Sequence, residues 1–252
     1  MATIADRRAL RARRISAEHR FFSGMAIALA ATVFVGFAPS YYLHGEIGDQ
    51  ITTYLDPPPQ PIRALFLLHG AAFTGWFLLQ LVQSLLIANK RLGLHRLLGQ
   101  AALILAPLIV VLGVVATFYT VRHGFHDTQR SPLQLAAFPL FTLAWFSGFV
   151  IAGLSLRKSP QSHKRLMLLA SIAIVGPATG RIVALPYPDW LPMWWDWAIV
   201  FALPLVVWDL ATLRRLHRAT LIGVCIFVLM FPLQTWVRTS PAWMNMIATV
   251  TA

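Results

Sequence analysis

The chain has 252 residues, of which 58% are hydrophobic and only 12% are charged, and its mean hydropathy is +0.66. Soluble globular domains carry about a quarter charged residues, so this composition excludes a soluble domain and also a disordered or collagen-like chain. The single cysteine, Cys225, excludes an intrachain disulfide. The formal net charge of +12 would suggest nucleic-acid binding, so its meaning depends on where the cations lie.

Seven segments are apolar and long enough, at about 20 residues, to cross a bilayer as helices. In chain order they are Phe21–Ala38, Ala64–Ala88, Leu97–Tyr119, Leu133–Leu156, Leu166–Leu185, Met193–Leu213 and Ala219–Val237. The sequence therefore predicts an all-α polytopic membrane protein with seven transmembrane helices. We divide it into a basic tail (residues 1–20), a transmembrane domain (21–238) and a short external tail (239–252).

The positive charge is unevenly distributed between the two ends of the predicted bundle. With the N-terminus in the cytoplasm, sixteen Lys and Arg residues lie on the cytoplasmic side and five on the other. This bias predicts a cytoplasmic N-terminus and an external C-terminus. The charge of +12 thus indicates a face that attracts anionic lipids, and no nucleic-acid partner, in a bacterial inner (plasma) membrane.

Polar residues recur on one face of the second predicted span. His69, Phe73, Trp76, Gln80 and Gln83 follow one another at intervals of three or four residues. Because polar groups are costly in a bilayer, we expect this face to point into the bundle. Two interpretations stay open: the wall of a cofactor or substrate cavity, or interhelical hydrogen bonding.

Two further histidines, His95 and His163, begin the third and fifth predicted spans on the cytoplasmic side. Each is followed by a basic residue, an apolar run and a proline. Histidines at equal depth on two helices could supply both axial ligands of a b-type haem. The alternative is that both belong to an ordinary basic flank.

The outer side carries a third group of histidines. His44, His123 and His126 could form a three-histidine site for Zn²⁺ or Cu²⁺ with an open coordination position. The alternative is that these are solvated loop residues.

Arg181 is predicted about one turn inside the outer end of the fifth span. It lies eighteen residues from His163, which corresponds to five helical turns and places both residues on one face of a continuous helix. Arg181 could hold a haem propionate or an anionic substrate, with Asp189 or Asp196 as its charge partner. The alternative is a cation that extends to the interface.

Three stretches carry a resemblance to known proteins. With "HGAAFTGW" and "HRLLG" in the second and third spans and "HKRLMLLASIAIVGPATGR" in the fifth, the chain resembles a family of uncharacterised bacterial multi-pass membrane proteins. This resemblance implies no activity.

More remotely, the order His69, Gln83, His95 resembles di-haem b-type transmembrane cytochromes, which move electrons across membranes. The resemblance implies that His69 is an outer haem ligand and that His95 and His163 form an inner pair. The outer pair has no second histidine within the spans, so His123 or His126 would have to complete it.

Three functions follow as hypotheses, and the sequence leaves open whether the protein is an enzyme, whether it forms homo-oligomers and what its redox partner is. The first is an electron-transport protein that binds haem b through His95 and His163, with His69 and Arg181 nearby. The second is a small-molecule transporter or membrane sensor whose cavity is lined by His69, Trp76, Gln80, Gln83 and Arg181. The third is an outward-facing metal-dependent hydrolase that uses His44, His123 and His126.

Overall fold

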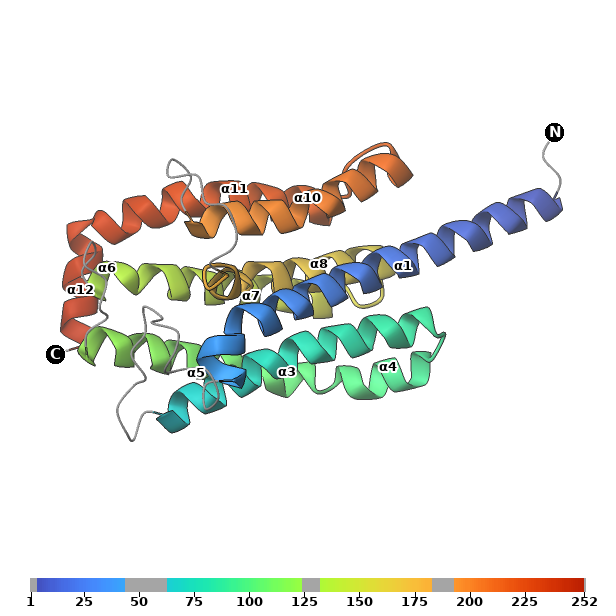
Figure 1. The fold of residues 1–252 in the computed structure, drawn as a ribbon. Helices are drawn as coiled ribbons and strands as arrows, with labels where there is room; N and C mark the ends of the chain where they lie inside the picture. The colour runs from blue at the N-terminus through green and yellow to red at the C-terminus, as the bar shows by residue number, and fades with distance from the viewer. Residues whose placement is uncertain (1–3, 44–62, 124–131, 183–192, 252) are drawn as a thin grey trace.

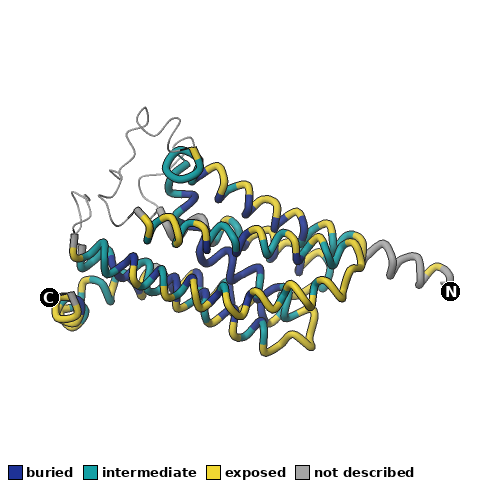
Figure 2. Tube along the Cα trace, turned by 90° about the horizontal axis from the view of Figure 1, so that it is seen from below, coloured by how far each residue is buried: buried dark blue, intermediate teal, exposed yellow. Residues whose placement is uncertain are grey.

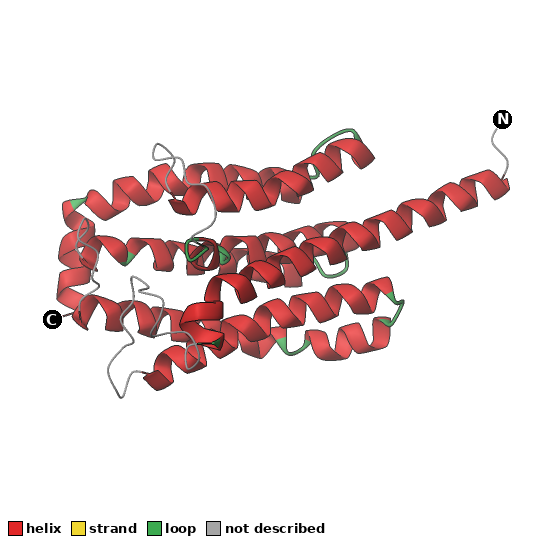
Figure 3. Cartoon of the chain, viewed as in Figure 1, coloured by secondary structure: helices red, strands yellow, loops and turns green. Residues whose placement is uncertain are grey.

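A computed structural model describes residues 4–43, 63–123, 132–182 and 193–251. All regular elements in these ranges are helices (Figure 3), which confirms the predicted all-α class. They are α1 (Ile4–Phe37), the π-helical turn η1 (Ala38–Tyr42), α3 (Arg63–Ala88), α4 (Leu92–Gly99), α5 (Ala102–His123), α6 (Pro132–Leu135), α7 (Ala137–Ser155), α8 (Pro160–Ala173), α9 (Gly176–Thr179), α10 (Met193–Leu213), α11 (Arg218–Thr239) and α12 (Pro241–Thr251).

Within these residues, 5 helical segments are long and apolar enough to cross a membrane. They are Ile15–Tyr42, Ala64–Ala88, Leu92–Arg122, Leu133–Ser155 and Arg218–Thr239, and a shorter apolar helix covers Ile199–Leu213. Large apolar side chains also cover the outside of the bundle, such as Ile104 at 75% exposure and Leu203 at 51%. An apolar exterior of this kind suits lipid and not water, so the chain is a membrane protein.

The basic N-terminal segment continues directly into the first apolar segment. Residues 4–20 form the first half of α1 instead of a separate tail, and α1 projects beyond the other helices (Figure 1). The segment is rich in Ala and Arg, which favour a helix even where no neighbour packs against it.

The fifth predicted span is not one continuous helix. The structure breaks it after α8, at Ile174–Val175, and resumes with the single turn α9. Pro177 has no N–H to donate to the carbonyl of Ala173, and its ring would collide with that carbonyl in a continuous helix. The prediction that His163 and Arg181 share one face across five regular turns is therefore wrong.

The C-terminal segment also differs from the short tail predicted for residues 239–252. It forms α12, which lies across the end of the bundle opposite the N-terminus (Figure 1). The indole Nε1 of Trp243 donates to the carbonyl of Leu133 at 2.9 Å, and Ile247 is 1% exposed. These contacts dock α12 against α6.

The core is centred on α8, which packs against α1, α3, α7, α10 and α11. Buried residues follow the inner faces of these helices, and exposed residues their outer faces (Figure 2). Leu169 and Ile172 of α8 are fully buried, as are Trp76 of α3, Phe146 of α7 and Phe227 of α11. A short helix is thus enclosed by longer ones, so its broken end is surrounded by protein and not by lipid, as such a break requires.

The cation-rich segments gather at one end of the bundle. Residues 15–23 approach residues 85–90. Ion pairs and hydrogen bonds connect residue 18 with residues 161–165. The same kinds of contact connect residues 161–165 with residues 209–220. We call this end, formed by residues 15–20, 88–96, 157–165 and 209–220, the basic end. The loops that the charge count assigns to one side of the membrane therefore lie together.

Candidate functional site: a histidine pair at the basic end

The structure brings His95 and His163 together, although 68 residues separate them in the sequence. Their ring centroids are 6.4 Å apart and the ring planes are nearly perpendicular, at 83°. His95 lies on α4 and His163 near the start of α8, and both side chains are half-buried. On α4 the side chains around His95 are exposed, so this histidine is on the one face of the helix that packs inward.

The His163 ring is held by the backbone of the neighbouring helix. Its Nδ1 lies 2.8 Å from the carbonyl oxygen of Gly153 on α7. A carbonyl only accepts, so Nδ1 carries the proton and donates it, which leaves a lone pair on Nε2. An imidazole with Nδ1 bonded to a backbone carbonyl is the arrangement that orients histidines as metal ligands.

The His95 ring is held by the side-chain amide of Gln83 on α3. In the orientation that satisfies its neighbours, the amide nitrogen donates to Nδ1 and to the carbonyl of His95 (3.0 Å), and the amide oxygen accepts from the Gly99 N–H (2.8 Å). Nδ1 is then an acceptor, so the ring proton is on Nε2. The opposite orientation of the amide would place its oxygen against the His95 carbonyl and its nitrogen against the Gly99 N–H, so it is disfavoured. Gln83 thus sets which nitrogen of His95 carries the proton.

The rest of the polar face of α3 connects this helix to α8. The indole Nε1 of Trp76, fully buried, donates to Ser171 Oγ at 3.0 Å. One turn along, Gln80 Nε2 donates to the carbonyl oxygen of Met167 at 2.8 Å. The prediction that this face points into the bundle is confirmed for Trp76, and the contacts favour the interhelical interpretation for both residues. The lining of a transport cavity by these residues stays a prediction.

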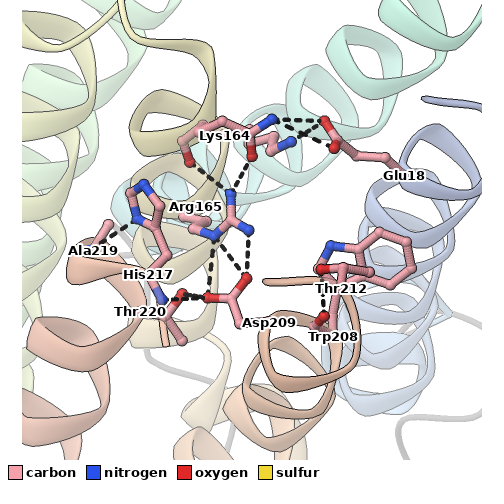
Figure 4. A network of polar contacts seen from close by, with 10 residues as sticks. Glu18, Lys164, Arg165, Trp208, Asp209, Thr212, His217, Ala219 and Thr220 are labelled. Carbon is pink, nitrogen blue, oxygen red and sulfur yellow. Dashed lines mark hydrogen bonds and ion pairs between the residues drawn. The ribbon is translucent and has the colours of Figure 1, made fainter. Parts of the chain in front are cut away.

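The basic end also contains a second cluster of polar contacts, which the sequence did not predict (Figure 4). Arg165, which the charge count treats as a loop cation, is 1% exposed and pairs with Asp209 of α10, which is fully buried. Arg165 Nε donates to Asp209 Oδ1 at 3.0 Å. Next to it, Lys164 pairs with Glu18 of α1 (Figure 4). In the sequence, this pair is indicated only by one cation, Arg165, and one carboxylate, Asp209, beside or within apolar segments. The spacing of the two residues does not show that they form an ion pair.

The start of α11 completes this cluster. The Asp209 carboxylate accepts from Thr220 Oγ1 (2.6 Å) and from the backbone N–H of His217 (3.0 Å). Burial lowers the pKa of the His217 imidazole, and the nearby Arg165 cation lowers it further. The neutral ring accepts from the Ala219 N–H at 3.1 Å and thereby caps α11. Asp209 thus receives four donor groups, two from Arg165 and one each from His217 and Thr220.

His69 and Arg181 lie in the other half of the bundle, away from the histidine pair. His69 is about 21 Å from Gln83 along α3, given 1.5 Å per residue. Its ring bonds to the carbonyl of Leu112 and contacts Phe73, while Nδ1 has no partner. The Arg181 guanidinium lies 4.5 Å from the Phe37 ring centroid and donates to the Pro177 carbonyl at 2.7 Å. The four residues predicted for cofactor binding therefore occupy two separate places.

The predicted outer metal site lies almost entirely outside the described residues. His44 and His126 are not among them, and of His123 only the backbone at the end of α5 is described. The expected partners of Arg181 are in the same position, because Asp189 is not described and Asp196 is described only as part of α10. Both predictions stay predictions.

The chain matches no family model, no curated protein and no solved structure.

Proposed function

We propose that this chain is a membrane redox protein that binds one b-type haem between His95 and His163. The spacing of the two rings carries the proposal. Two imidazoles that bind one metal ion at about 2 Å from each nitrogen have ring centroids roughly 6 Å apart, and the observed separation is 6.4 Å.

The number of ligands favours haem over a single metal ion. Structural zinc sites use four protein ligands and catalytic sites three. Among the described residues no group of three or more His, Cys, Asp or Glu could hold a metal ion. A haem needs only axial ligands from the protein, because the porphyrin holds the iron in its plane. Two histidines are therefore a complete set for haem and an incomplete one for zinc.

The proton positions define what each histidine would do. His163 already presents the lone pair of Nε2, because Gly153 fixes the proton on Nδ1. His95 would bind through Nε2 as the tautomer with its proton on Nδ1, which requires Nδ1 to leave its bond with the Gln83 amide nitrogen. The bond from this amide to the His95 carbonyl would still hold the residue, so Gln83 is a positioning residue. Haem bound here would supply reversible one-electron transfer. The buried ion pair of Arg165 and Asp209, close along the chain to His163, would keep α8 in place.

The topology that we propose for this protein has seven passes. Five are the long apolar segments, the sixth is α10, and the seventh is the broken pair α8–α9 in the centre of the bundle. The clustering of the cation-rich loops at one end supports a cytoplasmic location for that end in a bacterial plasma membrane.

The test is an absorption spectrum of the full chain purified in detergent after expression with a haem supply. We expect a Soret band and about one haem per chain by pyridine haemochrome assay. His95→Ala and His163→Ala should each abolish the band, whereas His19→Ala, a histidine at the same end of the bundle, should keep it. A colourless wild-type protein, or an unchanged band in both variants, would overturn the proposal.

Gln83→Leu provides a sharper measurement, because a merely structural role would not alter the iron. Loss of the amide should shift the midpoint potential and the spectrum of the bound haem, since hydrogen bonding to axial ligands tunes the metal.

The variant His69→Ala distinguishes a protein with one haem from a protein with two. If the outer half also binds haem, the haem content of this variant falls by half.

A further inference from the structure

A groove opens between α1 and α3 at the basic end of the bundle. It has a volume of about 550 Å³ and shares no residue with the histidine pair. The wall on the α1 side includes Ile15, His19 and Arg20, and the wall on the α3 side includes Leu85 and Lys90. This volume falls within the range of about 300–1,000 Å³ that is typical of small-molecule sites.

The two kinds of lining residue suit the two parts of an amphiphile. Arg20 and Lys90 are exposed cations that line the groove together with His19. Ile15 and Leu85, at 45% and 39% exposure, are open to the surroundings along its sides. Leu85 precedes Lys90 by five residues and lies deeper in the bundle, so it would contact an acyl chain, whereas Ile15 lies beyond Arg20 towards the N-terminus. The two cations would lie level with lipid headgroups.

The cations of the groove have no carboxylate to neutralise them among the residues that the structure describes. The two ion pairs found there use Lys164 and Arg165. Glu18, the nearest acid on α1, is already bonded to Lys164 and Gln161. An anion from outside the chain would therefore complement this charge.

The floor of the groove is polar as well. Ser23, 8% exposed, shares a hydrogen bond of 3.1 Å with Ser84 of α3, which joins the two helices at this point. Lys90 adopts the left-handed conformation (φ 59°) at the end of α3, where glycine is the usual residue. A lysine therefore lines the groove at a position where glycine would adopt the same backbone conformation without strain.

We propose that this groove binds the headgroup of an anionic phospholipid, with its phosphate between Arg20 and Lys90 and an acyl chain along Leu85. The site is independent of the haem proposal, because neither the residues nor the chemistry is shared. It would fix one lipid at the α1–α3 joint, where the projecting half of α1 leaves the bundle.

The test measures the binding of phosphatidylglycerol and phosphatidylcholine to the purified full chain by native mass spectrometry. We expect the wild type to retain phosphatidylglycerol and not phosphatidylcholine. The double variant Arg20→Gln/Lys90→Gln should bind phosphatidylglycerol at least tenfold more weakly, since each juxtamembrane cation contributes to the attraction. The control Arg157→Gln/Lys158→Gln removes the same charge from exposed residues of another loop at the basic end and should bind as the wild type does.

Two further variants keep the test decisive. Lys90→Gly removes the cation and relieves the strain of the left-handed turn. Weaker lipid binding by this variant would therefore come from the lost charge and not from unfolding. Leu85→Ala should also weaken the binding of phosphatidylglycerol, because it removes the side chain that the acyl chain would contact. Equal weakening in both double variants would mean that the lipid responds only to net charge. Unchanged retention in Arg20→Gln/Lys90→Gln would also overturn the proposal.

Discussion

At the scale of single residues, the ion pair between Arg165 and Asp209 dominates the basic end of the bundle. Both side chains are at most 1% exposed, so neither charge is stabilised by water. Removing one partner from a buried pair leaves the other charge uncompensated, which is far more costly than losing an exposed pair. Asp209 also accepts from Thr220 and His217, so the pair connects α8 with α10 and α11.

We predict that Asp209→Asn and Arg165→Gln each lower the free energy of unfolding by about 3–5 kcal/mol. The double variant should lose less than the sum of the two, because it leaves no unpaired buried charge. Unfolding of the purified chain in detergent measures these differences.

Lys164→Gln is the matched control for this double-mutant cycle. It breaks the neighbouring pair with Glu18, whose side chains are 19% and 24% exposed, and should cost no more than about 1 kcal/mol. If Asp209→Asn were as mild as Lys164→Gln, the buried pair would not be the element that stabilises this end.

At the scale of elements, the close approach of α1 to α9 depends on a residue without a side chain. A Cβ atom on Gly36 would lie 2.7 Å from the carbonyl carbon of Ala178 and 2.9 Å from its Cα, and would overlap its oxygen. Small residues allow such backbone contacts between membrane helices. The contact holds the short α9 against the end of α1, after the break that Pro177 imposes.

Gly36→Ala should therefore destabilise the protein by about 1–3 kcal/mol, since the backbone of α9 must move away. Gly24→Ala is a control in the same helix, because nothing lies within 4 Å of a Cβ atom built there. In that position alanine should leave stability unchanged or raise it by up to about 1 kcal/mol, as its helix propensity exceeds that of glycine. Thermal unfolding of both variants measures the difference, and effects of the same sign would contradict the packing described.

At the scale of the whole molecule, the two ends of the bundle differ in charge and in construction. The basic end carries the histidine pair, the buried ion pair and the groove between α1 and α3, and the opposite end is closed by α12 (Figure 1). A cation-rich end is retained in the cytoplasm during insertion. With the basic end in the cytoplasm, as we propose, the proposed haem would lie close to the cytoplasmic surface.

Cysteine labelling tests this orientation. In a Cys225→Ser background, we expect a membrane-impermeant maleimide to label Asn245→Cys of α12 in intact cells. Lys158→Cys, in the exposed loop between α7 and α8, should react only after permeabilisation. Labelling of Lys158→Cys in intact cells, or of both positions from one side, would contradict the orientation.

Sequence alone determined the class of the protein and most of its helices. Apolar length is a local property, so α3, α10 and α11 begin and end within two residues of the predicted spans. The interior face of α3 was also predictable, because a helical repeat fixes which residues share a side. The pairing of His95 with His163 was predicted from their equal depth, and the structure places their rings together.

Tertiary structure decided the partners. Pro177 is one of several prolines within predicted spans, and only the position of α8 inside the bundle allows its helix to break there. Arg165 resembles any flanking cation until α10 places Asp209 beside it, and Gln83 acquires its role through the packing of α3 on α4. Such contacts join residues far apart in the chain, so no local sequence pattern specifies them. The apolar length of a helix, by contrast, is determined by consecutive residues.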